Sequence, residues 1–324
     1  MTKHIFIVNP AAGKGPEATK ISEIISDACE ACEVTYEIHQ TTCRGDATAF
    51  TAAMVREKPP ADEYRFYACG GDGTLSDVVS GAVGEPGKPL PGISVGCVPI
   101  GTGNDFTRNF TQSEFFLDIT KQILGEPVVI DCFSVEGDTP ESQRCGVNMV
   151  NIGFDCDVVV KAGELKKRPW LPKSLAYVVG VAIMLKKNRG RTITVVNQDK
   201  SELTREFQLV AIANGGFCGG GFHSAPESRL DDGLLDLSLI KKVSRTAFLR
   251  LVGHYKNGTH LKTRLGKKVV TYIQTESAEL HFPEETNVCI DGDILKLHEL
   301  KLKIIPHSVL FLLPVGVELK QELK

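Results

Sequence analysis

The chain has 324 residues, a formal net charge of −3 and a pI near 6.3. This length allows two domains that each bury a sizeable core, and the slightly acidic balance argues against bulk nucleic-acid binding, which needs a basic surface. Because no apolar run approaches the roughly 20 residues of a membrane-spanning helix and the N-terminus lacks a signal-peptide core, we expect a cytoplasmic protein. The ten cysteines are scattered, which favours ordinary reduced thiols.

The first predicted strand is the apolar segment Ile5–Val8, which ends in a loop containing Gly13-Lys14-Gly15. A helix is expected from 17 to 29. The loop fits the Gly-x-Gly-x-x-Ala dinucleotide fingerprint, with Glu37 near the expected distance for a ribose contact, so an NAD-binding oxidoreductase is one alternative. Lys14 also suits a phosphate as a point charge. The chain contains no Gly-x-x-x-x-Gly-Lys-Ser/Thr sequence, which excludes the common P-loop kinases.

The second and third predicted strands also end in polar loops. The second, Val34–His39, leads into Thr41 and a Gly-Asp-Ala sequence that opens a helix, and the third, Phe66–Cys69, runs directly into Gly70-Gly-Asp-Gly-Thr-Leu-Ser76. Glycines allow a sharp turn that presents N–H groups to an oxyanion at the start of the next helix. Asp72 is the one residue of this loop that does not suit an oxyanion, because a carboxylate beside a phosphate is repelled unless a cation lies between them. A helix cap is the simpler alternative for this residue.

The fourth predicted strand, Ile93–Ile100, delivers Gly101-Thr-Gly-Asn-Asp-Phe106 into a further predicted helix. Strands that alternate with helices predict a parallel, doubly wound sheet, in which ligands bind beyond the carboxyl ends of the strands. Four polar, glycine-bearing loops then share one edge of the sheet, which turns alone explain poorly. The pattern therefore favours a phosphate-binding site at that edge.

The four loops together resemble a known family. Asn9-Pro-x-x-Gly, Thr41-x-x-x-Gly-Asp-Ala, Gly70-Gly-Asp-Gly-Thr and Gly101-Thr-x-Asn-Asp-Phe, in this order and spacing, are similar to the catalytic domain of diacylglycerol kinases and the bacterial lipid kinases. Sphingosine and ceramide kinases are related, and NAD kinases and 6-phosphofructokinases more distantly so. The resemblance implies that ATP is the phosphoryl donor and that Mg²⁺ is required. The residues expected to bind ATP are Asn9, Thr41, Gly70, Gly71, Asp72, Gly73, Thr74, Leu75, Ser76 and Thr102.

From about Pro127 the pattern changes to one strand after another, which predicts a β-sandwich or a similar antiparallel layer. The predicted strands are 128–135, 145–154, 192–196, 207–213, 234–240, 269–275, 279–282, 288–290, 295–305 and 309–313. We therefore expect two domains, an α/β nucleotide-binding domain and a β-rich domain. The first covers residues 1–127 and is joined by 315–324, and the second covers 128–314 and carries the metal site, the general base and the lipid site.

The segment that begins at Arg229 reads Arg-Leu-Asp-Asp-Gly-Leu-Leu-Asp and on its own is a glycine-closed turn before a strand. The family carries Asp-Asp-Gly-x-Leu-Asp here. The resemblance implies that Mg²⁺ is held by the Asp232 carboxylate and by the carbonyl oxygens of Arg229 and Leu234. This set of hard oxygen donors suits Mg²⁺. The same resemblance implies a water-linked network of Asp72, Asp105 and Asp232 between the domains.

The sequence Val288-Cys-Ile-Asp291-Gly-Asp293 places a carboxylate directly after a predicted strand. As structure alone, Asp-Gly is a common hairpin turn. The family has Asp-Gly-Glu at this point, and the resemblance implies that Asp291 is the general base, which must lie within hydrogen-bond reach of the acceptor hydroxyl. Asp293 replaces the glutamate of the family, which leaves the role of that position open.

The segment 161–191 is rich in lysine and arginine, contains the single tryptophan Trp170 beside Leu171, and has an almost wholly apolar stretch at 175–185. Two interpretations stay open for it. One is a core helix with solvated basic ends, and the other is peripheral docking to an anionic membrane surface.

The hypothesis that accounts for these features is an ATP- and Mg²⁺-dependent lipid kinase that phosphorylates diacylglycerol at a membrane surface. Its partners are ATP and a lipid substrate, without nucleic acid, and a homodimer is compatible with the sequence. The first alternative is a related kinase acting on a sphingoid base, phosphatidylglycerol or NAD. The second is a nucleotide-binding membrane sensor without catalytic activity.

Overall fold

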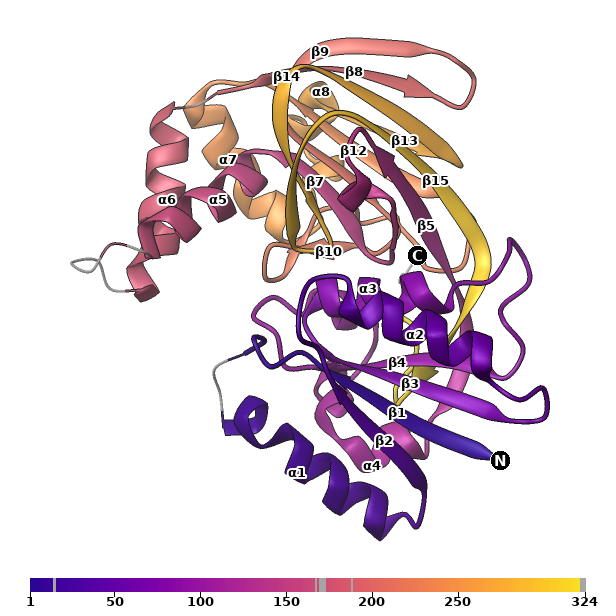
Figure 1. Cartoon of the computed structure of the whole chain (residues 1–324). Coiled ribbons are helices and arrows are strands. Elements are labelled where there is room, and N and C mark those ends of the chain that lie inside the picture. The colour runs from indigo at the N-terminus through magenta and orange to yellow at the C-terminus, as the bar shows by residue number, and fades with distance from the viewer. Residues whose placement is uncertain (14–15, 167, 169–172, 188, 321–324) are drawn as a thin grey trace.

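The computed structural model describes residues 1–13, 16–166, 168, 173–187 and 189–320 (Figure 1). Its helices are α1 (Pro16–Ala31), α2 (Asp46–Glu57), α3 (Asp72–Ala82), α4 (Ile119–Ile123), α5 (Phe154–Lys166), α6 (Lys173–Lys187), α7 (Arg245–Lys256) and α8 (Gly266–Val269). Its strands are β1 (Thr2–Val8), β2 (Thr35–Gln40), β3 (Glu63–Gly70), β4 (Ile93–Pro99), β5 (Glu126–Gly137), β6 (Arg144–Gly146), β7 (Met149–Gly153), β8 (Arg191–Asn197), β9 (Glu202–Ala213), β10 (Phe217–Cys218), β11 (Phe222–His223), β12 (Leu235–Lys241), β13 (Val270–Thr275), β14 (Ser277–Ile290) and β15 (Asp293–Leu313). The strand–helix alternation of the first half and the succession of strands in the second agree with the sequence pattern.

The first domain is a parallel sheet with strand order β2-β1-β3-β4. Alternate residues of β1 and β3 are buried on its two faces: Ile5 and Phe66 pack toward α2 and α3, whereas Phe6 and Tyr67 pack toward α1 and α4. Near-continuous apolar strands are typical of parallel sheets covered on both faces. The doubly wound prediction is confirmed, and the strand order reverses between β1 and β3, where such folds bind ligands.

The prediction of an α-helix after Gly101 is wrong. A short 3₁₀ turn, Phe106–Asn109, stands in its place. The local hydrogen bonds explain this, because the Asn109 side-chain amide donates to the Phe106 carbonyl at 2.8 Å and the Phe110 N–H donates to the Thr107 carbonyl at 3.2 Å. In an α-helix the Phe110 N–H would instead donate to the Phe106 carbonyl.

The second domain is built from antiparallel strands around a separate apolar core from β5, β7, β8, β9, β12, β14 and β15. β7 and β8 lie end to end between β9 and β14, since each pairs with a different half of both. Two pairs of predicted strands merge: 279–282 with 288–290 into β14, and 295–305 with 309–313 into β15, each with a register shift in between.

Helix α7 was not predicted, although the sequence holds a signal for it. Ser244 caps its N-terminus by accepting the Ala247 N–H at 3.3 Å. Phe248, Leu251 and Tyr255 follow at the spacing of one buried helix face.

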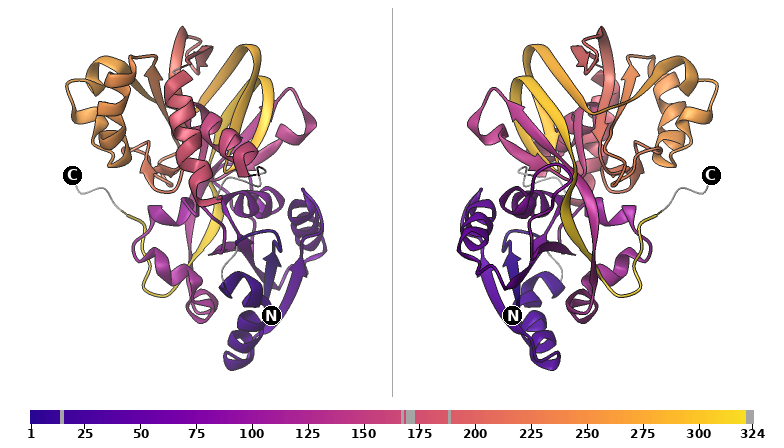
Figure 2. Two further views of the ribbon diagram at one scale, coloured as in Figure 1. Left: turned by 90° about the vertical axis from the view of Figure 1, so that its left-hand side faces the viewer. Right: turned by 90° about the vertical axis from the view of Figure 1, so that its right-hand side faces the viewer.

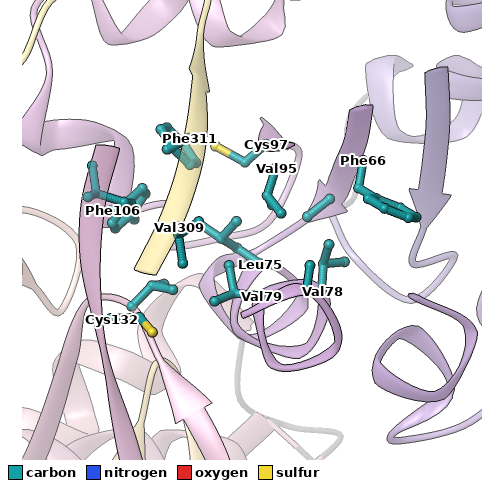
Figure 3. Packing of buried hydrophobic residues seen from close by; sticks show 14 of the residues in the cluster. Phe66, Leu75, Val78, Val79, Val95, Cys97, Phe106, Cys132, Val309 and Phe311 are labelled. Atoms are coloured by element: carbon teal, nitrogen blue, oxygen red, sulfur yellow. The ribbon is translucent and has the colours of Figure 1, made fainter. Parts of the chain in front are cut away.

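Strand β15 joins the two domains (Figures 1 and 2). From Leu300 to Leu313 it pairs with β5, and near its end Phe311 pairs in parallel with Val95 of β4, so one sheet runs through both domains. Phe311 and Val309 lie in the apolar cluster of the first domain beside Phe106 and Leu75 (Figure 3). The chain thus returns to the first domain within β15, before residue 315. The boundaries at 127/128 and 314/315 stay predictions.

Beyond β15 the chain keeps contact with the first domain. Val317 is buried in the same cluster, and Leu319 forms an isolated bridge with Phe110. The last residues of the predicted segment, 321–324, lie outside the described residues.

Candidate active site

A cleft of about 990 Å³ lies between the two domains at the carboxyl edge of the parallel sheet. The first domain supplies the loops after β1, β2, β3 and β4, and the second supplies β7, α5, the loop between β10 and β11, and the turn between β14 and β15. The four loops singled out in the sequence therefore do meet at one site, and the second domain closes it.

The loops after β3 and β4 touch each other through glycines. The Gly101 N–H donates to the Gly70 carbonyl at 3.0 Å. A Cβ built on Gly101 would lie 2.4 Å from Gly71 Cα, whereas one built on Gly103 would lie 3.4 Å from Asp105 Oδ2. The close approach of the backbones, not a positive φ, therefore demands glycine at position 101.

Gly101→Ala is expected to separate these two loops and to lower the affinity for nucleotide by about 5- to 150-fold, because overpacking against backbone costs about 1–3 kcal/mol. The measurement is the rise in thermal unfolding temperature on adding ATP and Mg²⁺. Gly103→Ala is the matched control for stability, since its methyl group has room. An unchanged nucleotide response of Gly101→Ala would contradict the proposed role of this contact.

Seven of the ten residues expected to bind ATP line the cleft: Asn9, Thr41, Gly71, Asp72, Gly73, Thr74 and Thr102. The Asn9 amide donates to the Thr74 hydroxyl at 3.2 Å, which ties the β1 loop to the start of α3. Gly70, Leu75 and Ser76 are not among the lining residues. Ser76 is fully buried, and its hydroxyl donates to the Cys145 carbonyl at 2.6 Å, because α3 packs there against β6.

The two acids of the first domain, Asp72 and Asp105, are adjacent. Asp72 accepts the backbone N–H groups of Asp105 at 2.9 Å and Phe106 at 3.0 Å. Asp105 in turn accepts the Gly220 N–H of the second domain at 2.9 Å and the Arg108 guanidinium at 3.2 Å. Burial raises the pKa of Asp72 to about 6, against the lowering effect of its two N–H partners.

Activity is expected to fall as the pH drops through about 6, because Asp72 then takes up a proton. The protonated carboxyl group carries an O–H donor, which cannot accept a hydrogen bond from a backbone N–H group. Asp72 would therefore lose one of its two bonds to the N–H groups of Asp105 and Phe106, which hold the loop after β4. The measurement is the pH profile of kcat/KM from pH 8 to pH 5, with the unfolding temperature recorded at each pH. A flat profile from pH 7 to pH 5.5 in folded protein would contradict this.

Asp291 forms the two-residue turn between β14 and β15 with Gly292, both at positive φ (45° and 91°), so the hairpin interpretation is confirmed. Its buried carboxylate lines the cleft and accepts three backbone N–H groups, from Val147 at 2.8 Å, Asn148 at 3.1 Å and Met149 at 2.7 Å. Burial raises its pKa, while these bonds lower it. The carboxylate is thus fixed in orientation.

Arg144 is a residue of the site that the sequence did not indicate. Its side chain is 7% exposed and bonds Asp293 at 2.7 Å and the Ser76 hydroxyl at 3.0 Å, with Asp77 at 3.7 Å. The guanidinium therefore fixes the half-exposed Asp293 carboxylate beside the cleft and links β6 to α3. A lone arginine before Cys-Gly carries no sequence signal, since only the packing of β6 on α3 gives it partners.

Asp232 lies apart from this constellation. It is not among the residues that line the cleft, and the structure brings only Asp72 and Asp105 of the expected three-acid network together. One Asp232 oxygen accepts the Leu234 N–H at 3.0 Å, and Asp131 and Asp231 are the acids beside it. The second oxygen of this half-buried carboxylate can still coordinate a hard cation. Coordination of Mg²⁺ by Arg229, Asp232 and Leu234 therefore stays a prediction.

The cleft is strongly acidic. Six aspartates line it, Asp72, Asp77, Asp105, Asp155, Asp291 and Asp293, whereas Arg44 is the one basic side chain among its described lining residues. A polyphosphate would be repelled by such a surface unless a divalent cation accompanied it. The residues present thus fit a metal–nucleotide complex better than a free nucleotide.

The basic segment contains α6 and the end of α5, two helices that pack against each other and project from the second domain (Figure 1). Leu175 of α6 is 49% exposed and Val159 of α5 is 41% exposed. Trp170 and Leu171 lie outside the described residues, as do Lys14 and Gly15 of the dinucleotide fingerprint. Within the described residues, no helix is long and apolar enough to cross a membrane.

Comparisons with known proteins agree with this arrangement. The family model described as the diacylglycerol kinase catalytic domain matches residues 3–135. The model described as the YegS C-terminal NAD kinase beta sandwich-like domain matches residues 148–313, which is more than half of the chain.

Individual relatives are distant but nearly full-length. The diacylglycerol kinase of Bacillus subtilis is 25% identical over 296 residues, 90% of each chain. A protein of Stenotrophomonas maltophilia named a probable lipid kinase YegS-like is 26% identical over 293 residues, covering 88% of this chain and 89% of its own. A diacylglycerol kinase structure from Bacillus anthracis superposes with a TM-score of 0.63 at 20% identity and covers 97% of both chains, which establishes the shared fold.

Proposed function

This chain belongs to the family of diacylglycerol kinases and YegS-like lipid kinases, and we propose that it transfers the γ-phosphate of ATP to a lipid hydroxyl, with diacylglycerol as the first-choice acceptor. The observation that supports this most directly is the single cleft in which the phosphate-type loops of the first domain meet Asp291 of the second. Phosphoryl transfer needs mainly positioning and neutralisation of charge, which glycine loops and aspartates around a cation can supply.

The nucleotide binds across the loops after the parallel strands. Backbone N–H groups of Gly71 and Gly73 and the hydroxyls of Thr74, Thr41 and Thr102 face the phosphates, near the N-terminus of α3. Asn9 holds Thr74 in place. Asp72 keeps the loops after β3 and β4 together through its two N–H partners.

Mg²⁺ would neutralise phosphate charge in this acidic cleft, and a further Mg²⁺ would be held by Asp232 with the Arg229 and Leu234 carbonyls. Asp291 accepts the proton of the lipid hydroxyl as the general base. Its three N–H partners leave one of about four lone-pair positions for the substrate and fix the direction in which that position points.

Membrane contact is peripheral and is made by the α5–α6 pair, whose exposed Leu175 and basic residues suit an anionic interface. Flotation with liposomes tests this: binding should increase with anionic lipid, and indifference to lipid charge would count against it. The expected location is the cytoplasmic side of a membrane.

The test of the function is an assay with radiolabelled ATP and Mg²⁺ against diacylglycerol, a sphingoid base, phosphatidylglycerol and NAD, with products separated by chromatography. Labelled phosphatidic acid is expected. Label in another acceptor would establish the related kinase instead. Nucleotide binding without any labelled product would favour a sensor, and protection against heat by NADH rather than ATP would favour an oxidoreductase.

A further inference from the structure

The loop between β2 and α2 carries the one basic side chain among the described residues that line the cleft, Arg44. Its side chain is 51% exposed, and its Nη2 atom lies 3.4 Å from Oδ2 of Asp293. Arg44 therefore reaches across the cleft from the first domain to the turn between β14 and β15. A nucleotide that enters the cleft with its cation meets this single fixed positive charge among aspartates.

The loop that carries Arg44 is held by its neighbours. The Asp46 carboxylate accepts the Thr42 N–H at 2.7 Å and the Thr42 hydroxyl at 2.9 Å. The other oxygen of this carboxylate lies 3.2 Å from Nε2 of His39 at the end of β2. Because these contacts fix the backbone on both sides of Arg44, its side chain reaches only the neighbouring part of the cleft.

That part of the cleft is where the transferred phosphate is expected. A Cβ built on Gly73, at the start of α3, would lie 3.4 Å from the Asp291 carbonyl oxygen and 3.4 Å from Asp293 Oδ1. The N-terminal end of α3, which suits a phosphate, thus abuts the turn that carries the expected general base. In-line transfer requires the γ-phosphoryl group to lie between the two. Arg44, bonded to the Asp293 carboxylate, stands directly beside this position.

Asp293 keeps an ionic partner without Arg44. Arg144, which is only 7% exposed, bonds the same oxygen of Asp293 at 2.7 Å. Because an ion pair weakens with distance and with screening by solvent, this contact is stronger than the one that the more exposed Arg44 makes at 3.4 Å. The guanidinium of Arg44 can therefore leave Asp293 for a phosphate.

We propose that Arg44 binds the γ-phosphoryl group of ATP and exchanges its contact with Asp293 for one with that group. A guanidinium presents a planar fork of N–H donors that matches two phosphate oxygens, and its charge offsets the charge on those oxygens during transfer. The inference rests on the proposed kinase function and adds a residue that distinguishes ATP from ADP, since ADP lacks the γ-phosphoryl group.

The experiment measures, by calorimetry and without lipid, the dissociation constants of ADP and of the β,γ-imido analogue of ATP, both with Mg²⁺. The deciding quantity is the ratio of the affinity for the analogue to that for ADP, since a general disturbance of the nucleotide loops changes both. Arg44→Gln is expected to lower this ratio about tenfold, the loss that follows from one hydrogen bond to a charged group. An unaltered affinity for ADP shows that the variant is folded and its loops are intact.

Arg56→Gln is the matched control. Arg56 is exposed in the last turn of α2 and does not line the cleft. About ten residues of helix, roughly 15 Å, separate it from the start of α2 next to Arg44. The substitution removes the same charge from the same domain, so its ratio should equal that of the unaltered protein.

Turnover provides a second measurement, with the acceptor that the labelled-product assay identifies. Arg44→Gln is expected to lower kcat by about 10²–10³-fold, the usual loss when one donor to the charge of the transition state is removed. Arg56→Gln is expected to leave kcat unchanged.

The failures are distinguishable. A ratio of affinities that Arg44→Gln does not change would overturn this inference, while labelled lipid product from the unaltered protein would leave the lipid kinase intact. A ratio lowered equally by Arg56→Gln would also overturn it, because the effect would then be one of general charge. Folded protein that binds neither nucleotide and yields no labelled product would overturn the proposed function and the inference with it.

Discussion

Asp291→Asn is expected to lower turnover by about 10²–10⁴-fold, the usual loss when a general base is removed, while the protein still binds ATP. The replacement keeps the shape of the side chain. In the unaltered protein, three backbone N–H groups donate to the two carboxylate oxygens of Asp291. The asparagine offers these donors only one oxygen, and its NH₂ group takes the place of the other. The unfolding temperature must therefore be measured together with the rate, and the rise produced by ATP shows that the nucleotide loops are intact.

Asp293→Asn is the comparison for this prediction, because it removes a neighbouring carboxylate that also lines the cleft but is held by Arg144. A loss confined to Asp291→Asn supports the base at position 291. Turnover that survives within a few-fold in Asp291→Asn, with the large loss in Asp293→Asn instead, would place the base two residues further along the chain.

Phe311→Ala is expected to destabilise the protein by about 3–5 kcal/mol, the usual cost of removing a buried phenylalanine. Phe311 is fully buried on the strand that joins the domains, and its ring centroid lies 5.1 Å from that of Phe106 and 5.4 Å from that of Phe110. The loss of the ring would leave a cavity between the sheet and the segment after β4 (Figure 3).

The measurement is the free energy of unfolding from urea denaturation, with Leu124→Ala as the control, since Leu124 is 60% exposed. Surface substitutions of this kind usually change stability by no more than about 0.5 kcal/mol. Equal effects of both substitutions would show that β15 does not anchor one domain on the other.

The architecture of the first domain and the chemistry of its loops could be predicted from the sequence alone. A run of apolar residues such as Phe66–Cys69 predicts a buried strand, and the glycines that follow it predict a tight turn. Both predictions depend only on neighbouring residues in the chain. The position of Asp72 in a phosphate-type loop indicated a nearby cation, because a carboxylate and a phosphate repel each other. The Asp291-Gly292 turn was also readable, since adjacent positive φ values call for this pair.

Which residues contact one another across the two domains could not be predicted in this way. The hydroxyl of Ser76, placed at the phosphates by its motif, is bound instead by the carbonyl of Cys145, and Arg144 acquires a role through the same packing of β6 on α3. Asp232, which the resemblance places in one network with Asp72 and Asp105, stands outside the cleft. Such contacts join residues far apart in the chain, so their partners follow from how the two domains pack and not from any spacing in the sequence.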